Sequence, residues 1–454
     1  MDTTQDLPID EQLREEAGEE PAFIVPAENV EVAEDALKSA PIDDDDDMEE
    51  EEEKIDQGND GEANSAVDIV EDMSIFRLEK VHTDSLFSVD AIPITLGAEK
   101  ALAIASGGGD DRAYLTFVSS SDQSSKVMRC AHDHTDSVSC VSFNRSGEVS
   151  DSSGLMLAVG SFDGTVQLYD VQKAAVDAMN NVDIVSKGRQ LDGPSDIEWI
   201  AWHPKGGTVL LAGSSDATVW MWFATNGKCL QVFVGHEGEV TDGCFTKDGK
   251  FAVTISTDMT MRIWAPKTGL SRHVFRNQGG NRFAEAPLLC LDLGGGTDGQ
   301  LAIVGAEDGT AWIVHLANKK ILTCLSHCSE GDLRSVEAVG FAPNSVNVNW
   351  CATAGVDGTL KIWDLTNNQC RQVCKHNKSA VTRIRWHKNL PLVYSAASDG
   401  VIRVWDARNG ALVKHLTGHN EVINDMRVVP NSEGEQDIIV SGSDDHSLKV
   451  FTVS

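Results

Sequence analysis

One short pattern recurs eight times along this chain, and a unit repeated at a fixed spacing of tens of residues must stack or circle to bury its apolar surface. Each copy is an apolar strand ending in a small residue, then an Asp, then a second strand that closes on an aromatic residue. The clearest copies are GSFDGTVQLYD, AGVDGTLKIWD and AASDGVIRVWD. Spaced 42 to 53 residues apart, the turn Asp is expected at Asp111, Asp163, Asp216, Asp258, Asp308, Asp357, Asp399 and Asp445.

This spacing is that of a WD-repeat blade, so the sequence predicts an all-β fold, an eight-bladed WD-repeat β-propeller over residues 73–454. The Asp-Gly pairs at several turns are typical of tight hairpins. A ring of blades must also close on itself. The chain ends in a strand at 448–453, and residues 74–80 can supply the missing outer strand of that last blade.

The net charge of -34 is concentrated at the N-terminus, where residues 1–72 carry 28 Asp and Glu against three Lys and Arg. The run DDDDDMEEEEE at 43–53 cannot bury enough apolar surface to offset its chain entropy, so residues 1–72 are predicted to be a disordered acidic tail. Such a charge balance disfavours direct nucleic-acid binding and favours a basic protein partner.

Neither a secretory signal nor an apolar stretch long enough to cross a bilayer is visible, so no membrane association is expected. The ten Cys lie mostly in apolar strand-like runs and are typical of reduced thiols in the cytoplasm, with the nucleus as the alternative location. One Cys and His group (Cys324, His327, Cys328, Cys370, Cys374 and His376) lacks paired C-x-x-C ligands. We therefore expect a monomer without metal or cofactor.

Several blades contain a His, a Ser or Thr, an Asp and a Trp in the order that WD repeats use to hold a blade together. The set is complete in two blades: His236, Thr254, Asp258 and Trp264, then His376, Ser395, Asp399 and Trp405. Blade eight has Phe451 in place of Trp, and blade six has no His in register. A His near an Asp and a Ser also fits a hydrolase, but the set recurs from blade to blade, which favours a structural role.

Two stretches in blade three, DIEWIAWHP at 196–204 and LLAGSSDATVWMW at 210–222, contain Trp residues that ordinary WD repeats lack. They resemble the family of the angio-associated migratory cell protein, which includes a fungal chaperone of a large-subunit ribosomal protein. DGVIRVWDARNG near the C-terminus and the acidic tail are similar as well. The resemblance implies a non-enzymatic chaperone that shields a basic ribosomal protein and delivers it during assembly of the large subunit.

A basic client needs an anionic surface before RNA neutralises it, and acidic residues recur where propeller loops enter a blade or precede the turn Asp. Several such carboxylates add affinity for a Lys- and Arg-rich segment and speed its encounter. The predicted partner-binding residues on this acidic face are Asp84, Asp110, Asp136, Glu198, Trp199, Glu239, Glu307, Glu421 and Asp444.

Two other binding functions would use the same surfaces. One is a histone or chromatin adaptor, because histone tails are also basic. The other is a substrate receptor of a cullin ubiquitin ligase, based on the tetrapeptide WDAR at 405–408. An enzyme is not expected, since the chain has neither a G-x-x-x-x-G-K-[S/T] phosphate loop nor a G-x-S-x-G nucleophile motif.

Overall fold

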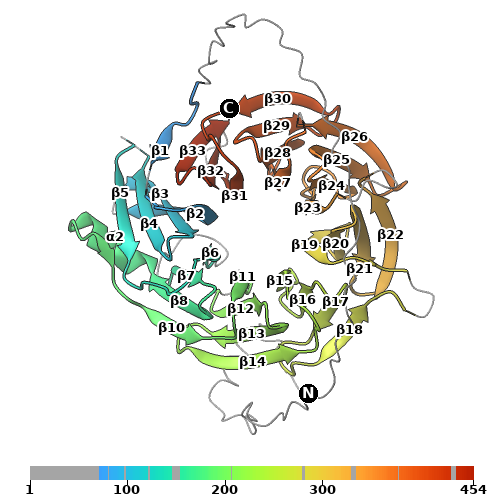
Figure 1. Cartoon of the computed structure of the whole chain (residues 1–454), viewed down its shortest axis with the longest axis horizontal. Coiled ribbons are helices and arrows are strands. Elements are labelled where there is room, and N and C mark those ends of the chain that lie inside the picture. The colour runs from blue at the N-terminus through green and yellow to red at the C-terminus, as the bar shows by residue number, and fades with distance from the viewer. Residues whose placement is uncertain are drawn as a thin grey trace, which may run out of the picture. The chain divides into compact units, whose positions relative to one another are not determined.

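The computed structural model describes residues 71–79, 81–96, 99–120, 123–145, 154–205, 207–278, 282–328, 334–376, 378–430 and 436–453. Almost all of the predicted acidic tail therefore lies outside the described residues. The described part of the chain forms eight sheets arranged around a central axis (Figure 1). The predicted eight-bladed β-propeller is confirmed.

The first four blades follow one another along the chain, each in the order given by its hydrogen-bonded strands. Blade one contains β2 (Leu86–Leu96), β3 (Glu99–Gly108), β4 (Ala113–Ser119), β5 (Ser125–Cys130) and β9 (Ile184–Val185). Blade two contains β6 (Cys140–Phe143), β7 (Met156–Gly160), β8 (Thr165–Asp170) and β10 (Arg189–Asp192). Blade three contains β11 (Ile197–Trp202), β12 (Val209–Ser214), β13 (Thr218–Phe223) and β14 (Lys228–Val234). Blade four contains β15 (Asp242–Phe245), β16 (Ala252–Ile255), β17 (Met261–Trp264) and β18 (Ser271–Phe275).

The other four blades continue the same order around the ring. Blade five contains β19 (Leu288–Gly295), β20 (Leu301–Ala306), β21 (Thr310–His315) and β22 (Lys320–Ser326). Blade six contains β23 (Val336–Phe341), β24 (Trp350–Gly355), β25 (Thr359–Asp364) and β26 (Gln369–Lys375). Blade seven contains β27 (Val381–Trp386), β28 (Leu392–Ala397), β29 (Ile402–Asp406) and β30 (Ala411–Leu416). Blade eight contains β31 (Ile423–Val429), β32 (Asp437–Ser443), β33 (Leu448–Val453) and β1 (Phe76–Leu78).

The position of a strand within its blade explains its pattern of apolar residues. Second strands such as β16 and β12 are buried at every residue, because each blade packs its two faces against its neighbours. Outer strands such as β22 alternate between exposed and covered residues, since they lie at the rim. The helix α2 (Val171–Met179) follows β8, and no helix in the described part of the chain is long and apolar enough to cross a membrane.

The innermost strand of each blade is a sheet edge, and side chains of the preceding blade satisfy some of its exposed N–H groups. The carboxylate of Asp242 accepts from Leu291 N at 3.0 Å, and that of Asp425 accepts from Val89 N at 3.0 Å. Asp90 and Asp292 make the same contact two positions further along the strand, with Phe143 N at 2.9 Å and Phe341 N at 2.7 Å. These bonds tie one blade to the next and leave fewer unpaired edge groups.

The ring closes through β1, which pairs antiparallel with β33 so that Phe76 lies opposite Val450. This strand falls within the predicted closing segment 74–80. Just before it, Asp72 accepts from Lys449 Nζ at 2.8 Å and from Ser74 N at 2.9 Å. Burial alone would raise the pKa of Asp72, but these two bonds lower it by more, so it lies well below its usual range.

Replacing Asp72 by Ala should lower the free energy of unfolding by about 2 kcal/mol at pH 7, because the mostly buried ammonium of Lys449 would lose its carboxylate. The folded pKa is depressed, so the contribution is present above pH 4 or so and disappears only in strong acid. Urea unfolding at pH 7 measures the loss. Glu79→Gln, which alters only an exposed ion pair with Arg77, is the matched control, and equal losses in both variants would contradict the prediction.

Candidate functional site

The His, Thr, Asp and Trp set of blade four forms a buried hydrogen-bond chain. His236 Nδ1 lies 2.9 Å from the Asp258 carboxylate, and its Nε2 lies 2.7 Å from Thr254 Oγ1. Trp264 Nε1 donates to the same hydroxyl at 2.8 Å. Burial lowers the pKa of His236, and both ring nitrogens are occupied by the set itself. The arrangement therefore holds the loop before β15 against the sheet and offers no free nucleophile or base.

Blade seven departs from the predicted set at one contact. His376 Nε2 lies 2.7 Å from Ser395 Oγ, and Trp405 Nε1 donates to that hydroxyl at 2.9 Å. Asp399 instead accepts two bonds from Arg403, at 3.1 and 2.6 Å, and His376 Nδ1 is buried without a partner. The predicted set of blade seven is therefore incomplete, because the guanidinium of Arg403 holds both oxygens of Asp399 and leaves His376 Nδ1 without it.

Blade six does have a histidine in its set, so the prediction that it has none in register was wrong. His327 Nδ1 lies 2.6 Å from Thr353 Oγ1, its Nε2 lies 3.2 Å from Asp357, and Trp363 Nε1 donates to Thr353 at 2.8 Å. More residues separate His327 from β23 than separate His236 from β15. The histidine of blade six therefore does not align with that of blade four in the sequence repeat. His327 and His376 thus belong to the sets of two different blades.

Blade one corrects the position of the first turn Asp. In the other blades the residue after the turn Asp has a positive φ, as in Gly164 at 78° and His446 at 61°. In blade one that residue is Asp111, with φ 61°, so the turn Asp is Asp110. Its carboxylate lies 2.8 Å from His82 Nδ1 and its side chain is 3% exposed. Asp110 is therefore a structural residue, and its assignment to the acidic binding face was wrong.

Trp199 also belongs to the interior, so its assignment to the partner-binding face was wrong. Its ring is 8% exposed and its Nε1 donates to Val240 O of the next blade at 2.8 Å. A side chain at Gly213 or Gly243 would collide with this ring. Gly213 lies in the second strand of blade three and Gly243 in the innermost strand of blade four, and the two glycines are the sequence signal for such an inserted indole.

The remaining predicted acidic residues lie at one end of the ring, which we call the turn face. It is formed by the loops that enter the innermost strands and by the turns that join second and third strands. Seven of the predicted carboxylates belong to it, all exposed or half-buried: Asp84, Asp136, Glu198, Glu239, Glu307, Glu421 and Asp444. Within the described chain none of the seven forms an ion pair with Lys or Arg, and Asp444 accepts only from Asn424 Nδ2, at 2.6 Å.

Three carboxylates of blades three and four gather at this face, and we call Asp196, Glu198 and Glu239 the Glu198 cluster. Burial first, and then the charges of Glu239 and Asp196, raise the pKa of Glu198 to about 7. A second acidic group lies at blades one and two, where burial and then the charge of Asp136 raise the pKa of Asp111. Asp196 was not among the predicted binding residues, although it lies only two residues before Glu198. The approach of Glu239 to this pair depends on how blades three and four pack.

Charge is balanced differently deeper in the ring. The innermost strands of all eight blades line a central cavity of about 440 Å³. There Asp90 pairs with Arg145 at 2.5 Å and Arg427 at 3.4 Å, and Asp425 lies 3.4 Å from Arg383. Burial lowers the pKa of Arg427 to about 10 even though Asp90 opposes the shift. Asp90 and Asp425 thus have Arg partners in the cavity, which the seven turn-face carboxylates lack within the described chain.

Replacing Glu198 by Gln should stabilise the protein by about 1 kcal/mol at pH 8 and change little at pH 5. The raised pKa means that the folded state keeps a proton that the unfolded chain releases, so stability falls as pH rises from about 4.5 to 7. The value is reduced from the full shift because solvent screens a half-buried group. Urea unfolding at both pH values tests this, with Glu307→Gln on the same face as control. A gain that is equal at pH 5 and pH 8 would rule out titration of Glu198 as its cause.

Comparison with known proteins places this architecture in a family. A family model described as "WD domain, G-beta repeat" matches residues 125–170, 186–222 and 227–265, and one described as "Nucleolar protein 10-like, N-terminal domain" matches residues 247–453. The angio-associated migratory cell protein of Homo sapiens is 32% identical over 385 residues, which cover 82% of this chain and 79% of that protein. The chain belongs to the angio-associated migratory cell protein family. The protein of Pongo abelii shows the same identity and coverage.

Solved structures share the propeller fold of this member of the angio-associated migratory cell protein family. Sqt1 of Saccharomyces cerevisiae superposes with a TM-score of 0.70 at 22% identity, covering 85% of this chain and all of that one. Sqt1 of Chaetomium thermophilum, bound to the N-terminus of the ribosomal protein L10, superposes with a TM-score of 0.68 at 23% identity. That match covers 84% of this chain and 100% of the other. Identities this low establish a common fold.

Proposed function

We propose that this protein is a non-enzymatic chaperone that shields a basic large-subunit ribosomal protein and delivers it during ribosome assembly. The observation that carries the proposal is the set of unpaired carboxylates on the turn face. An ionised group without a counter-ion is unfavourable in a partly buried setting, so a Lys or Arg side chain from a client relieves repulsion that already exists. The repulsion is best supported at the Glu198 cluster, because the charges of Glu239 and Asp196 both raise the pKa of Glu198.

The chemistry of the client follows from this charge. Neighbouring turn-face carboxylates suit an extended segment with several Lys or Arg residues, because each contact is weak and their sum is substantial. In the Chaetomium thermophilum complex, the segment bound to Sqt1 is the N-terminus of ribosomal protein L10. By analogy of fold, the client of this chain is the host's counterpart of that ribosomal protein. The protein would act as a monomer in the cytoplasm.

A binding titration tests the proposal. The full chain is titrated against three fluorescent peptides: the N-terminal segment of the host's L10 counterpart, a histone H3 tail, and a scrambled neutral control. The ribosomal peptide should bind at least about tenfold more tightly than the histone tail, a difference of about 1.4 kcal/mol. Binding should weaken as salt increases, because exposed charges are screened.

Two outcomes would overturn this function. Tighter binding of the histone tail would favour the chromatin-adaptor alternative. Affinity that stays constant between low and molar salt would show that charge does not drive recognition. The cullin-receptor alternative has no specific support in the structure, since Trp405 is buried in its set and Arg408 forms an ion pair with Asp406 at 2.6 Å.

A further inference from the structure

Blade two lacks the hydroxyl that completes the set in other blades. Five blades place a Ser or Thr four residues before the turn Asp, next to the Nε2 or Nδ1 atom of their histidine: Ser106, Thr254, Thr353, Ser395 and Ser441. Blade two has Val159 at this position, although it keeps both its histidine, His134, and its turn Asp, Asp163. His134 Nε2 is consequently buried without a hydrogen-bond partner.

Whether His134 Nε2 carries a proton is decided by the hydrogen bond of the other ring nitrogen, Nδ1. His134 Nδ1 lies 2.9 Å from the Asp163 carboxylate, which can only accept, so Nδ1 carries the proton and Nε2 carries a lone pair. His134 is 5% exposed. The result is a buried lone pair held in place by a carboxylate, as in metal-binding histidines whose other nitrogen donates to an acid.

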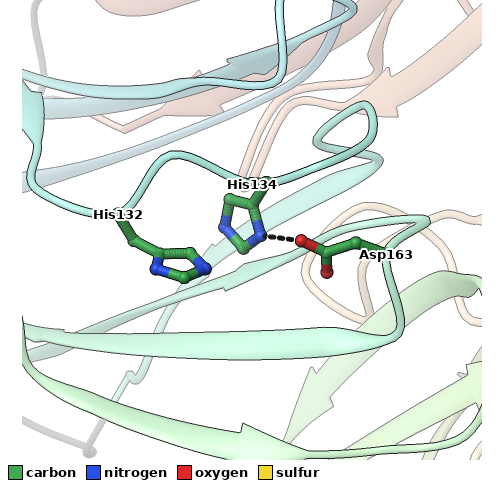
Figure 2. A group of neighbouring side chains, drawn as sticks. All are labelled: His132, His134 and Asp163. Carbon is green, nitrogen blue, oxygen red and sulfur yellow. Dashed lines mark hydrogen bonds and ion pairs between the residues drawn. The ribbon is translucent and has the colours of Figure 1, made fainter.

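A second imidazole lies beside it. Figure 2 shows His132 on the side of His134 that faces away from Asp163. The ring centroids are 4.5 Å apart and the ring planes are nearly perpendicular, at 87°. The possible ligand atoms of His132, His134 and Asp163 all lie within 4.8 Å of one another. His132 is only partly buried, so its ring can rotate to share an ion with His134.

The neighbouring charges are mixed. Asp163 lies 2.9 Å from His134, and Asp133 pairs with Arg129 at 3.5 Å and with Arg112 at 3.9 Å. A metal ion here would therefore be held by the two imidazoles and not by an excess of negative charge.

We propose that His134 Nε2 and His132 bind a borderline transition-metal ion, with Zn²⁺ as the expected ion. Zn–N bonds are about 2.0–2.1 Å and imidazole is a preferred ligand of zinc. The two oxygens of Asp163 are occupied by His134, Thr135 and Thr165, so this residue orients His134 and does not bind the ion. Water completes the coordination. The sequence signal is the His-x-His pair of CAHDH combined with the missing hydroxyl at Val159.

Zinc titration of the full chain, followed by calorimetry and by competition with a chromophoric chelator, tests the site. One Zn²⁺ per chain is expected to bind to the unaltered protein. His132→Ala removes a ligand on the loop surface and should weaken binding at least about tenfold. His273→Ala, which removes a partly buried imidazole in another blade, should leave binding unchanged and is the matched control.

Val159→Thr keeps the shape of the side chain and supplies the hydroxyl that other blades have. Its O–H would donate to His134 Nε2 and compete with the metal, so Zn²⁺ affinity should fall about tenfold while the midpoint of thermal unfolding rises. Absence of Zn²⁺ binding in the unaltered chain would overturn the proposal. So would binding that survives both His132→Ala and Val159→Thr, which would place the ion elsewhere, for example on the exposed thiols Cys324 and Cys370.

Discussion

Reversing the charge of the Glu198 cluster, in a triple variant carrying Asp196→Lys, Glu198→Lys and Glu239→Lys, should weaken binding of the basic ribosomal peptide by about 100-fold. Each exposed pair contributes about 0–1 kcal/mol, and a reversal replaces that attraction with repulsion. Three reversals thus cost about 3 kcal/mol, or two powers of ten in the dissociation constant. Fluorescence anisotropy at a fixed ionic strength of about 0.1 M measures the change. The dependence of affinity on salt should become shallower as well.

The control must carry the same change in net charge at the other end of the ring. Glu99 begins β3, Asp177 lies in α2 and Asp298 lies in the turn between β19 and β20, all at the end opposite the turn face. Reversing these three should leave peptide affinity within about twofold, because screening limits the reach of surface charge to about 10 Å. Equal losses in both triple variants would show that overall charge, and not the turn face, attracts the client. Circular dichroism of both variants checks that the blades remain folded.

Thr254→Val, which replaces a hydroxyl by a methyl group, should lower the free energy of unfolding by about 3 kcal/mol. The hydroxyl joins His236 Nε2 to Trp264 Nε1, at 2.7 and 2.8 Å, and its removal leaves two buried polar groups without partners. Each such group costs about 1–3 kcal/mol. Urea unfolding with and without the substitution gives the difference.

Thr225→Val is the matched control, since Thr225 is exposed in the loop after β13 and its substitution should change stability by less than about 0.5 kcal/mol. A Thr254→Val variant as stable as the unaltered protein would mean that the set contributes little beyond shape. Blade two naturally has Val159 where blade four has Thr254. Thr254→Val therefore removes the hydroxyl from blade four, and Val159→Thr adds one at the same position in blade two.

Much of the fold was predictable because its signals are local. A turn Asp, a small residue and a closing aromatic lie within one hairpin, so they can be recognised without knowing how blades pack. The same holds for the set of blade four, whose members lie within 28 residues of one another. Blade one shows the limit of this approach. Asp110 and Asp111 are chemically identical neighbours, and the positive φ of Asp111 and the contact of Asp110 with His82 show which of them caps the turn.

The candidate site was less predictable, because it depends on contacts between blades. The carboxylates predicted for the turn face could be found as single positions, but their neighbours could not be read from a linear pattern. Trp199 follows Glu198 directly, yet one side chain faces the cavity and the other fills a gap between blades. Glu198 is the extra residue of a β-bulge in β11, which interrupts the alternation of the strand. Which of the two side chains meets a neighbouring blade is therefore decided by how the blades pack.

By itself, the sequence determined the number of blades and the way the ring closes, because repeated short-range signals specify each hairpin. It also determined the excess of negative charge and the family. Only the tertiary structure decided which carboxylates lack a counter-ion and that Arg403, not His376, binds Asp399. It also decided that His132 lies beside the unpaired Nε2 of His134. The physical reason is that desolvation and pairing of charged groups depend on distances of a few ångströms between residues far apart in the chain.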